Sequence, residues 1–236
     1  ITCHDGITLY DLYSYNEKHN ESNGWDNTDG SNDNHSWNCG TEGETKNEAV
    51  NALRRRMIRN ACAVLMCSRG IPMFLAGDEF GNTQFGNNNP YCHDDEVSWL
   101  DWSLLDKNWD IFRFFQFMIH FRKEHPVLRS NISDGFGGLP DISFHGTSPW
   151  IKEFSSYDRY IGVMMAGQIE GKAPEAVYIA SNAYWEQLDV VLPELPESMA
   201  WSLEVSTWEN DNREGKPVES SFVIPPRTVM VFCGKI

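Results

Sequence analysis

Two residue pairs in the sequence have types and positions that could act on a substrate. His4 and Asp5 follow an extended apolar start, and Asp78 and Glu79 follow the apolar run 71–76. Hydrolysis of a glycosidic bond with retention needs carboxylates roughly 5 to 5.5 Å apart, and neighbouring strands lie ~4.8 Å apart. Both pairs could therefore serve a sugar site, although an aspartate after a strand more often caps a turn or a helix.

A long polar segment, 16–47, separates the first pair from the next apolar stretch. It is rich in Asn, Asp, Glu, Gly and Ser, which favour turns, and it carries Trp25 and Trp37. Aromatic faces stack on the C–H surface of sugars, while amides and carboxylates bond sugar hydroxyls. From composition alone, a surface loop with its tryptophans packed inward is an equal alternative.

Other residue clusters give little support for a metal or a cofactor. The run 92–96 and the pair His35 and Cys39 contain ligand types but lack zinc-site spacing. No glycine-rich phosphate loop and no G-x-S-x-G motif is present in the sequence. We therefore expect no metal and no cofactor.

Charge and composition limit the classes of partner that we expect. The 236 residues carry a formal net charge of −15 and 41% hydrophobic residues. This charge repels phosphate backbones and anionic lipids, so neither nucleic acid nor a membrane is expected as a partner. The longest apolar run is far below the ~20 residues of a membrane span. Six cysteines without a paired motif, and no leader, predict reduced thiols in the cytoplasm.

The segments that would position the two pairs are predicted to form a βαβ unit. Apolar residues at three- and four-residue steps predict an amphipathic helix over 47–70, between a strand at 1–3 and a strand buried on both faces at 71–76. Such a crossover makes the strands parallel, so both pairs would lie at their carboxyl ends, where α/β folds bind ligands. A further helix over 109–128 is apolar nearly all round and is expected to be buried on several faces.

After Pro140 the sequence changes to short β-rich runs separated by Pro, Gly, Asn and Glu. This texture predicts an antiparallel β-sandwich. We place the boundary near 135–140, giving an α/β domain at 1–135 and a β-sandwich domain at 136–236.

Three long motifs carry a family resemblance. The segments "TCHDGITLYDLYSYNEKHNESNG", "DGSNDNHSWNCGTEGET" and "GIPMFLAGDEFGNTQFGNNNPYCHDDEVSWLDW" resemble isoamylase-type glycogen debranching enzymes, which belong to the α-amylase family of glycoside hydrolases. The similarity continues through "DISFHG" and "SNAYWEQLDVVLP" and so spans nearly the whole chain. The resemblance implies the last two βα units of a (β/α)8 barrel followed by a carboxyl-terminal antiparallel β-sandwich.

The resemblance also implies roles and a substrate. Asp5 corresponds to the aspartate that stabilises the transition state, and His4 to the histidine that bonds sugar hydroxyls. Trp37 and Glu79 are weaker candidates for substrate contact. The implied substrate is a branched α-glucan, such as glycogen, amylopectin or limit dextrin, cleaved at α-1,6 linkages with retention.

The family's nucleophile and general acid lie in motifs that these residues do not contain, so we expect the chain alone to be inactive. Asn82 and Phe144 depart from the residues usual in the family, which are Arg and Trp. Two parallel strands without neighbours would expose open edges, so we expect the chain either to self-associate or to leave part of 1–130 mobile. The alternative function is a natural non-catalytic glucan-binding or regulatory subunit.

Overall fold

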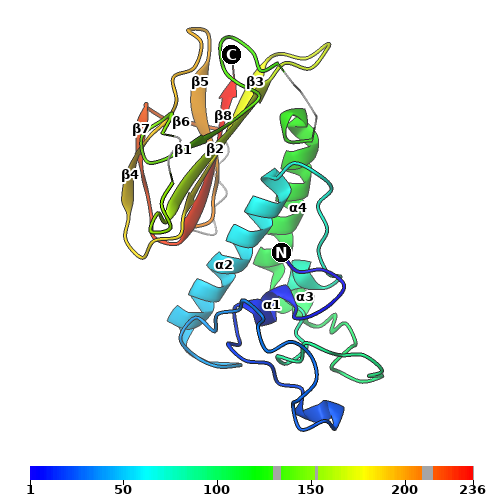
Figure 1. Cartoon of the computed structure of the whole chain (residues 1–236). Helices are drawn as coiled ribbons and strands as arrows, with labels where there is room; N and C mark the ends of the chain where they lie inside the picture. Colours follow the sequence, from blue (N-terminus) through cyan, green and yellow to red (C-terminus); the bar gives the residue numbers. More distant parts are fainter. Residues whose placement is uncertain (130–133, 152–153, 209–214, 236) are drawn as a thin grey trace. The chain divides into compact units, whose positions relative to one another are not determined.

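The computed structural model describes residues 1–129, 134–151, 154–208 and 215–235, which divide into two compact units (Figure 1). The first unit contains residues 1–65 and 71–118, and the second contains 66–70 and 119–236. The predicted boundary between two domains at 135/136 stays a prediction.

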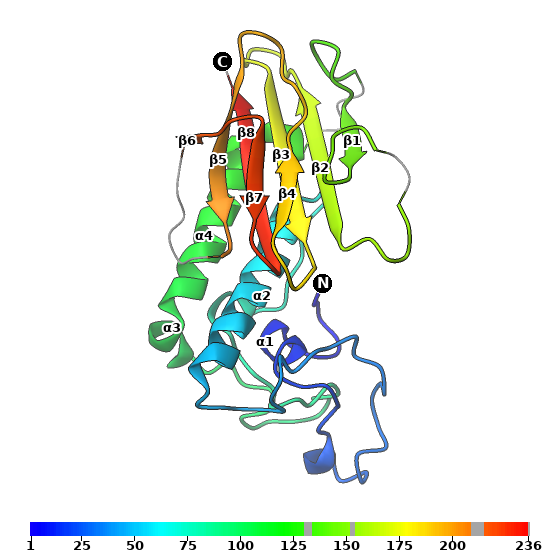
Figure 2. The same cartoon turned by 90° about the vertical axis from the view of Figure 1, so that its left-hand side faces the viewer.

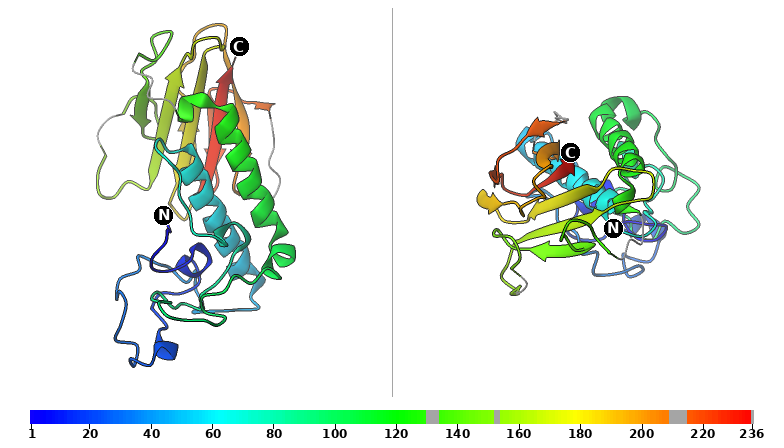
Figure 3. Two further views of the ribbon diagram at one scale, coloured as in Figure 1. Left: turned by 90° about the vertical axis from the view of Figure 1, so that its right-hand side faces the viewer. Right: turned by 90° about the horizontal axis from the view of Figure 1, so that it is seen from above.

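Two long helices form the frame of the first unit. α2 spans Glu48–Cys67 and α4 spans Trp109–Glu124, and they lie side by side in Figures 1 and 3. The Asn47 carboxamide oxygen accepts from the amides of Ala49 and Val50, so it caps the start of α2. α2 confirms the amphipathic helix predicted over 47–70, and α4 confirms that 109–124 is helical. The remaining elements of this unit are short: α1 at Leu9–Leu12, α3 at Leu104–Lys107, and 3-10 turns at Glu21–Asn23 and Asp78–Phe80.

The buried surface of α4 is narrower than expected. Ile111, Phe114, Phe115 and Met118 are buried, whereas Arg113 is exposed. Phe112 and Phe117 are only half-buried. The part of α4 in the first unit therefore has one buried face and one exposed face, rather than being buried on several faces as predicted.

The predicted parallel strands at 1–3 and 71–76 are not found. Within the described residues neither segment is a strand, and Ile71 and Met73 are 96% and 56% exposed, so the run 71–76 is not buried on both faces. A β-strand is defined by backbone hydrogen bonds to a partner strand. Here the contact is made by side chains instead: the Thr2 hydroxyl, in the first segment, donates at 2.6 Å to Oδ2 of Asp78, which lies just past the second segment. The two segments are close in space, as the predicted βαβ unit required, but no backbone hydrogen bonds pair them as strands.

The second unit is an antiparallel β-sandwich, as predicted. A six-stranded sheet has the order β1-β2-β3-β8-β5-β6, and a two-stranded sheet pairs β4 with β7 (Figure 2). The strands are β1 Ile142–His145, β2 Tyr160–Gly167, β3 Glu175–Asn182, β4 Leu188–Val191, β5 Ala200–Ser206, β6 Lys216–Pro217, β7 Ser221–Ile224 and β8 Thr228–Lys235. A short 3-10 helix, Pro126–Leu128, precedes them.

The core of the sandwich lies between the two sheets. Tyr178 on β3 and Phe232 on β8 are fully buried, and the Phe222 ring of β7 lies 4.5 Å from the Phe232 ring. Gly162 on β2 is required here, because a Cβ at this position would lie 1.9 Å from the Tyr178 hydroxyl. Alternating side chains of both sheets thus fill one apolar layer, which is what a sandwich needs.

Polar side chains attach the segments 66–70 and 119–129 to the sandwich within the second unit. The Arg122 guanidinium donates to the carbonyls of Met66, Ser68 and Gly70 at 2.7 to 2.8 Å. Glu175 on β3 accepts from His125 Nδ1 at 2.8 Å and from the Val127 amide at 3.1 Å. These buried contacts explain why the end of α4 belongs with the sandwich.

No helix in the described part of the chain is both long and apolar enough to cross a bilayer.

Candidate functional site

The predicted pair His4 and Asp5 lies in an exposed turn between the opening segment and α1. His4 Nε2 is 2.9 Å from Asp5 Oδ2, and the two side chains are 76% and 85% exposed. A carboxylate and an imidazole in contact and open to solvent can reach a ligand's hydroxyls without first displacing protein groups. The structure therefore leaves both side chains available.

Asp78 fixes the backbone on both sides of that pair. Its carboxylate accepts from the Thr2 hydroxyl at 2.6 Å, from the Leu9 amide at 2.8 Å and from the Leu75 amide at 3.1 Å. Asp78 is almost completely buried, and burial raises its pKa against the opposing effect of these donors. The residue thus holds the turn of His4 and Asp5 rather than facing a ligand itself.

Glu79 is placed differently from its neighbour. Its carboxylate Oε2 accepts from the Gly77 amide at 2.9 Å, which closes the turn after 71–76. The side chain is only half-buried. Its role as a substrate contact stays a prediction, beside this visible role in the turn.

Asp11 is a buried carboxylate that the sequence analysis missed. It accepts from the Thr83 hydroxyl, from the Gln84 amide at 2.7 Å and from the Gly86 amide at 3.3 Å, and so ties the loop after Asp78–Phe80 to α1. Burial raises its pKa to about 6. The signal that could have found it is the spacing Thr8-x-x-Asp11, because Thr8 caps α1 by accepting from the Asp11 amide at 3.1 Å.

The asparagine side chains of the polar loop form hydrogen bonds with one another and with residues 84–89. Asn20 Nδ2 donates to Asn88 Oδ1 at 2.9 Å, and Asn20 Oδ1 accepts from the Asn88 backbone amide at 2.9 Å. Asn23 Nδ2 donates to Asp29 Oδ2 at 2.7 Å and Asn87 Nδ2 donates to Asn23 Oδ1 at 2.6 Å. The loop is therefore folded onto 84–89 by side-chain hydrogen bonds, a structural use of residues that composition also assigned to sugar contacts.

The loop tryptophans are not packed inward. Trp25 is 69% exposed and Trp37 is 37% exposed, with the Trp37 backbone amide donating to the Leu12 carbonyl at 2.9 Å. That bond anchors Trp37 to the last residue of α1, a few residues after the His4 and Asp5 turn. An exposed aromatic face is available there for stacking on a sugar.

Among the residues that the structure describes, no group of three or more His, Cys, Asp and Glu side chains is arranged to hold a metal ion. No disulfide joins the cysteines in this part of the chain.

Comparison with known proteins gives relatives along nearly the whole chain. It is 38% identical, over 98% of its residues, to the glycogen operon protein GlgX homolog of Mycobacterium bovis, and 39% identical, over 98%, to isoamylase SU1 of Zea mays. Over 82% of its residues it is 48% identical to the glycogen debranching enzyme of Erwinia tasmaniensis. The chain covers 35%, 28% and 28% of these proteins, about a third of their length. No family model matches.

Solved structures support the fold. Apo pullulanase from Paenibacillus barengoltzii superimposes with a TM-score of 0.64 at 21% identity, covering 100% of this chain and 29% of that protein. Pullulanase from Bacillus acidopullulyticus gives a TM-score of 0.62 at 20% identity over 98% of this chain and 23% of its own length. At this identity the likeness concerns the fold alone.

Proposed function

This chain is a homologue of isoamylase-type glycogen debranching enzymes, in the α-amylase family of glycoside hydrolases, and we propose that it forms part of a hydrolase that cleaves α-1,6 branch linkages. The substrate would be glycogen or a related α-glucan such as amylopectin or limit dextrin, and the reaction would retain configuration. The observation that carries the proposal is 38% identity over 98% of the chain.

The proposed chemistry at that turn is electrostatic. Cleavage of a glycosidic bond passes through an oxocarbenium-like transition state, in which positive charge develops on the sugar ring. A fixed carboxylate beside the ring stabilises this charge more than it stabilises the ground state, so we assign Asp5 this role. His4 would bond hydroxyls of the same sugar, and Trp37 and Glu79 would make weaker contacts to the glucan.

Asp78 supports this assignment as a positioning residue. A transition-state stabiliser acts only if it is held in place before the reaction, and Asp78 bonds Thr2 and Leu9, one on each side of the His4 and Asp5 turn. In the proposal, the nucleophile and general acid come from segments outside these 236 residues, as do further strands of a (β/α)8 barrel. The chain alone would then bind glucan but not hydrolyse it.

The test is Asp5→Asn in the complete debranching enzyme. We expect turnover of a branched α-glucan to fall at least about 100-fold while the affinity for a linear maltooligosaccharide changes little, because the lost charge acts on the transition state. Asp189→Asn, at an exposed position of strand β4, is the matched control and should leave turnover unchanged. Unchanged turnover in Asp5→Asn would refute the assignment.

A second measurement separates the hydrolase from the alternative, a natural non-catalytic glucan-binding or regulatory subunit. An antibody against the sandwich, used on lysate from source cells, would detect a protein much larger than 27.0 kDa if the hydrolase proposal is correct. A band at this mass would favour the alternative. Light scattering on the chain itself tests the predicted self-association, and fractionation of the same cells tests the predicted cytoplasmic location.

A further inference from the structure

His93 connects two segments of the first unit that lie far apart in the sequence. Its side chain is 12% exposed, and both of its ring nitrogens face oxygen atoms. Nδ1 lies 3.0 Å from Asp95 Oδ2 in the same loop, and Nε2 lies 2.7 Å from Asn23 Oδ1 in the 3-10 turn Glu21–Asn23. A neutral imidazole has one N–H donor and one acceptor nitrogen, so it can bond only one of two accepting oxygens.

The orientation of the Asn23 carboxamide is fixed by its other partners. The Asn89 amide donates to Asn87 Oδ1 at 2.8 Å, so Asn87 Nδ2 is the group that donates to Asn23 Oδ1 at 2.6 Å. On its other side, Asn23 Nδ2 donates to Asp29 Oδ2 at 2.7 Å and to the Asn89 carbonyl at 2.9 Å. Turning the carboxamide over would set a donor against a donor and an oxygen against two acceptors. The oxygen of Asn23 is therefore the atom that faces His93.

The partner on the other side of the ring is an ionised carboxylate. Asp95 Oδ1 also accepts from the Val97 amide at 3.0 Å, and the hydrogen bond from His93, followed by this one, lowers the pKa of Asp95. An ionised carboxylate only accepts, so His93 Nδ1 must carry a hydrogen to bond it. Because Nε2 also faces an acceptor, the form of His93 that satisfies both contacts is the imidazolium.

The turn that His93 contacts belongs to a loop, 20–29, that presents Trp25 with 69% of its side chain exposed. This loop is tied to residues 87–95 in two places. At the first, Asn20 Nδ2 donates to Asn88 Oδ1 at 2.9 Å, a bond between amides that does not depend on pH. At the second, the oxygen of Asn23 is bonded to His93, whose charge does depend on pH.

We propose that His93 is a pH-sensitive clamp, which as an imidazolium holds the loop of Trp25 to residues 87–95 and loosens it on losing its proton. Deprotonation removes one of the two hydrogen bonds of the ring and its attraction to Asp95. The stabilisation is therefore present while His93 is charged and is lost as the pH rises. The inference stands on these contacts and does not rest on the proposed hydrolase.

Asp95 is the one charged group in contact with the His93 ring among the described residues. Lys18 Nζ donates to the carbonyl of residue 29 at 2.6 Å, and His19 Nε2 lies 3.1 Å from Glu42 Oε1. The remaining carboxylates of the two segments are exposed or bonded to other residues, and they are Glu21, Asp26, Asp29, Asp94 and Glu96. The charge of the ring is thus set mainly by Asp95.

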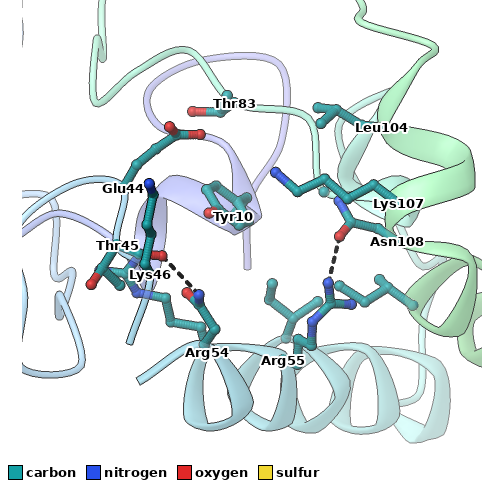
Figure 4. Close-up of a pocket in the computed structure, with 14 residues that line it drawn as sticks. Tyr10, Glu44, Thr45, Lys46, Arg54, Arg55, Thr83, Leu104, Lys107 and Asn108 are labelled. Atoms are coloured by element: carbon teal, nitrogen blue, oxygen red, sulfur yellow. Dashed lines mark hydrogen bonds between the residues drawn. The ribbon is translucent and has the colours of Figure 1, made fainter. Parts of the chain in front are cut away.

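A cavity of about 500 Å³ in the same unit is separate from the clamp. Figure 4 shows Glu44, Lys46 and Lys107 around this cavity, and neither His93 nor Asp95 lines it. The charged side chains of the cavity are therefore not partners of the His93 ring.

The test follows the ring and the loop together in the 236-residue chain. Long-range 1H–15N correlation NMR reports which His93 ring nitrogens carry hydrogen, and hydrogen exchange of the Asn23, Gly24 and Thr28 amides, corrected for intrinsic rates, reports the loop. We expect both nitrogens to carry hydrogen at low pH. Deprotonation of the ring and an about tenfold loss of protection should then occur over the same pH interval. A ring that loses its proton while the loop keeps its protection would overturn the proposal.

His93→Gln keeps a donor for Asn23 but cannot become charged, so it should remove this tenfold change. Any response that remains belongs to other groups, such as the buried Asp11. His35→Gln is the matched control, because His35 is an 87% exposed histidine of the same polar segment, and it should respond like the parent. Equal responses in the parent and in His93→Gln would overturn the proposal. Far-ultraviolet circular dichroism checks the fold, and if His93→Gln does not fold, the titration of the parent decides by itself.

Discussion

Both units of this chain bury apolar side chains, but their segments are held to one another in different ways. In the second unit, Tyr178 and Phe232 belong to one continuous apolar core between two sheets. In the first unit, buried polar residues such as Asp11, Asp78 and Asn88 hold irregular segments to one another by side-chain hydrogen bonds. Apolar burial is non-directional, whereas hydrogen bonds fix geometry.

This difference fits the proposed placement of the sugar site in the first unit. A site that recognises hydroxyls needs loops held in one conformation with their polar groups partly open, and a hydrogen-bonded network around Asp78 provides that. If the comparison is correct, the two units should respond in opposite ways to truncation of apolar and polar side chains.

The largest effect is expected from Phe232→Ala. Phe232 is fully buried on β8 and contacts the Phe222 ring, so its removal leaves a cavity between the sheets. We expect the free energy of unfolding of the sandwich to fall by about 3 to 5 kcal/mol. Urea denaturation followed by near-ultraviolet circular dichroism measures this. Phe144→Ala, on a side chain that is 48% exposed, is the control and should cost much less.

A smaller but comparable loss is expected in the first unit from Asp78→Ala. The substitution leaves the amides of Leu9 and Leu75 and the Thr2 hydroxyl without their acceptor, at a cost of about 2 to 3 kcal/mol. Native-state hydrogen exchange at α1 amides reports it. Exchange at β3 amides should not change, and equal loss of protection in both units would contradict the comparison.

The pH dependence of the two units should have opposite signs between pH 4 and 6. Burial raises the pKa of Asp11 to about 6, above its ordinary 3.8, so the folded first unit binds this proton first and gains stability as the pH falls through 6. Burial lowers the pKa of His145 from 6.5 to about 4, so the folded sandwich keeps this imidazole neutral and loses stability as the pH falls from 6.5 to 4. Each contribution is about 3 kcal/mol when the full shift is expressed.

Hydrogen exchange of amides in each unit, measured at several pH values and corrected for intrinsic rates, tests these signs. The His145 assignment also rests on geometry, because the Trp150 amide donates to His145 Nδ1 at 2.9 Å and requires an unprotonated nitrogen there. Asp11→Asn should flatten the slope in the first unit alone, and His145→Gln the slope in the second. Parallel slopes in both units would refute the prediction.

The smallest effect is expected from Glu42→Gln in the polar loop. The Glu42 carboxylate accepts from the backbone amides of Asn16 and Glu17 and from Asn38 Nδ2, at 2.8 to 3.2 Å. These donors lower its pKa, but the group is partly exposed, so we expect a loss of about 1 kcal/mol. Faster exchange of the Asn16 and Glu17 amides measures it. Glu21→Gln, on a more exposed side chain, is the control.

Much of the architecture could be predicted from local patterns. Local patterns predicted the amphipathic helix α2, the existence of α4 and the antiparallel sandwich after Pro140. This was possible because hydrophobic periodicity and turn residues are visible within short stretches of sequence. The pair His4 and Asp5 was singled out because it follows an apolar segment in a recognisable motif, and its role stays a prediction. The failure was the pair of parallel strands at 1–3 and 71–76, where apolar content predicted a ladder that the structure does not contain.

The sequence by itself determined the residue types at the His4 and Asp5 turn, the helical and strand-forming periods and the relationship to glycogen debranching enzymes. Only the tertiary structure decided which polar residues are structural. Asp78 was a candidate in sequence and Asp11 was not singled out, but both are buried and bonded to backbone amides from distant segments. Burial and hydrogen-bond partners depend on contacts between distant residues, and local sequence patterns do not contain them.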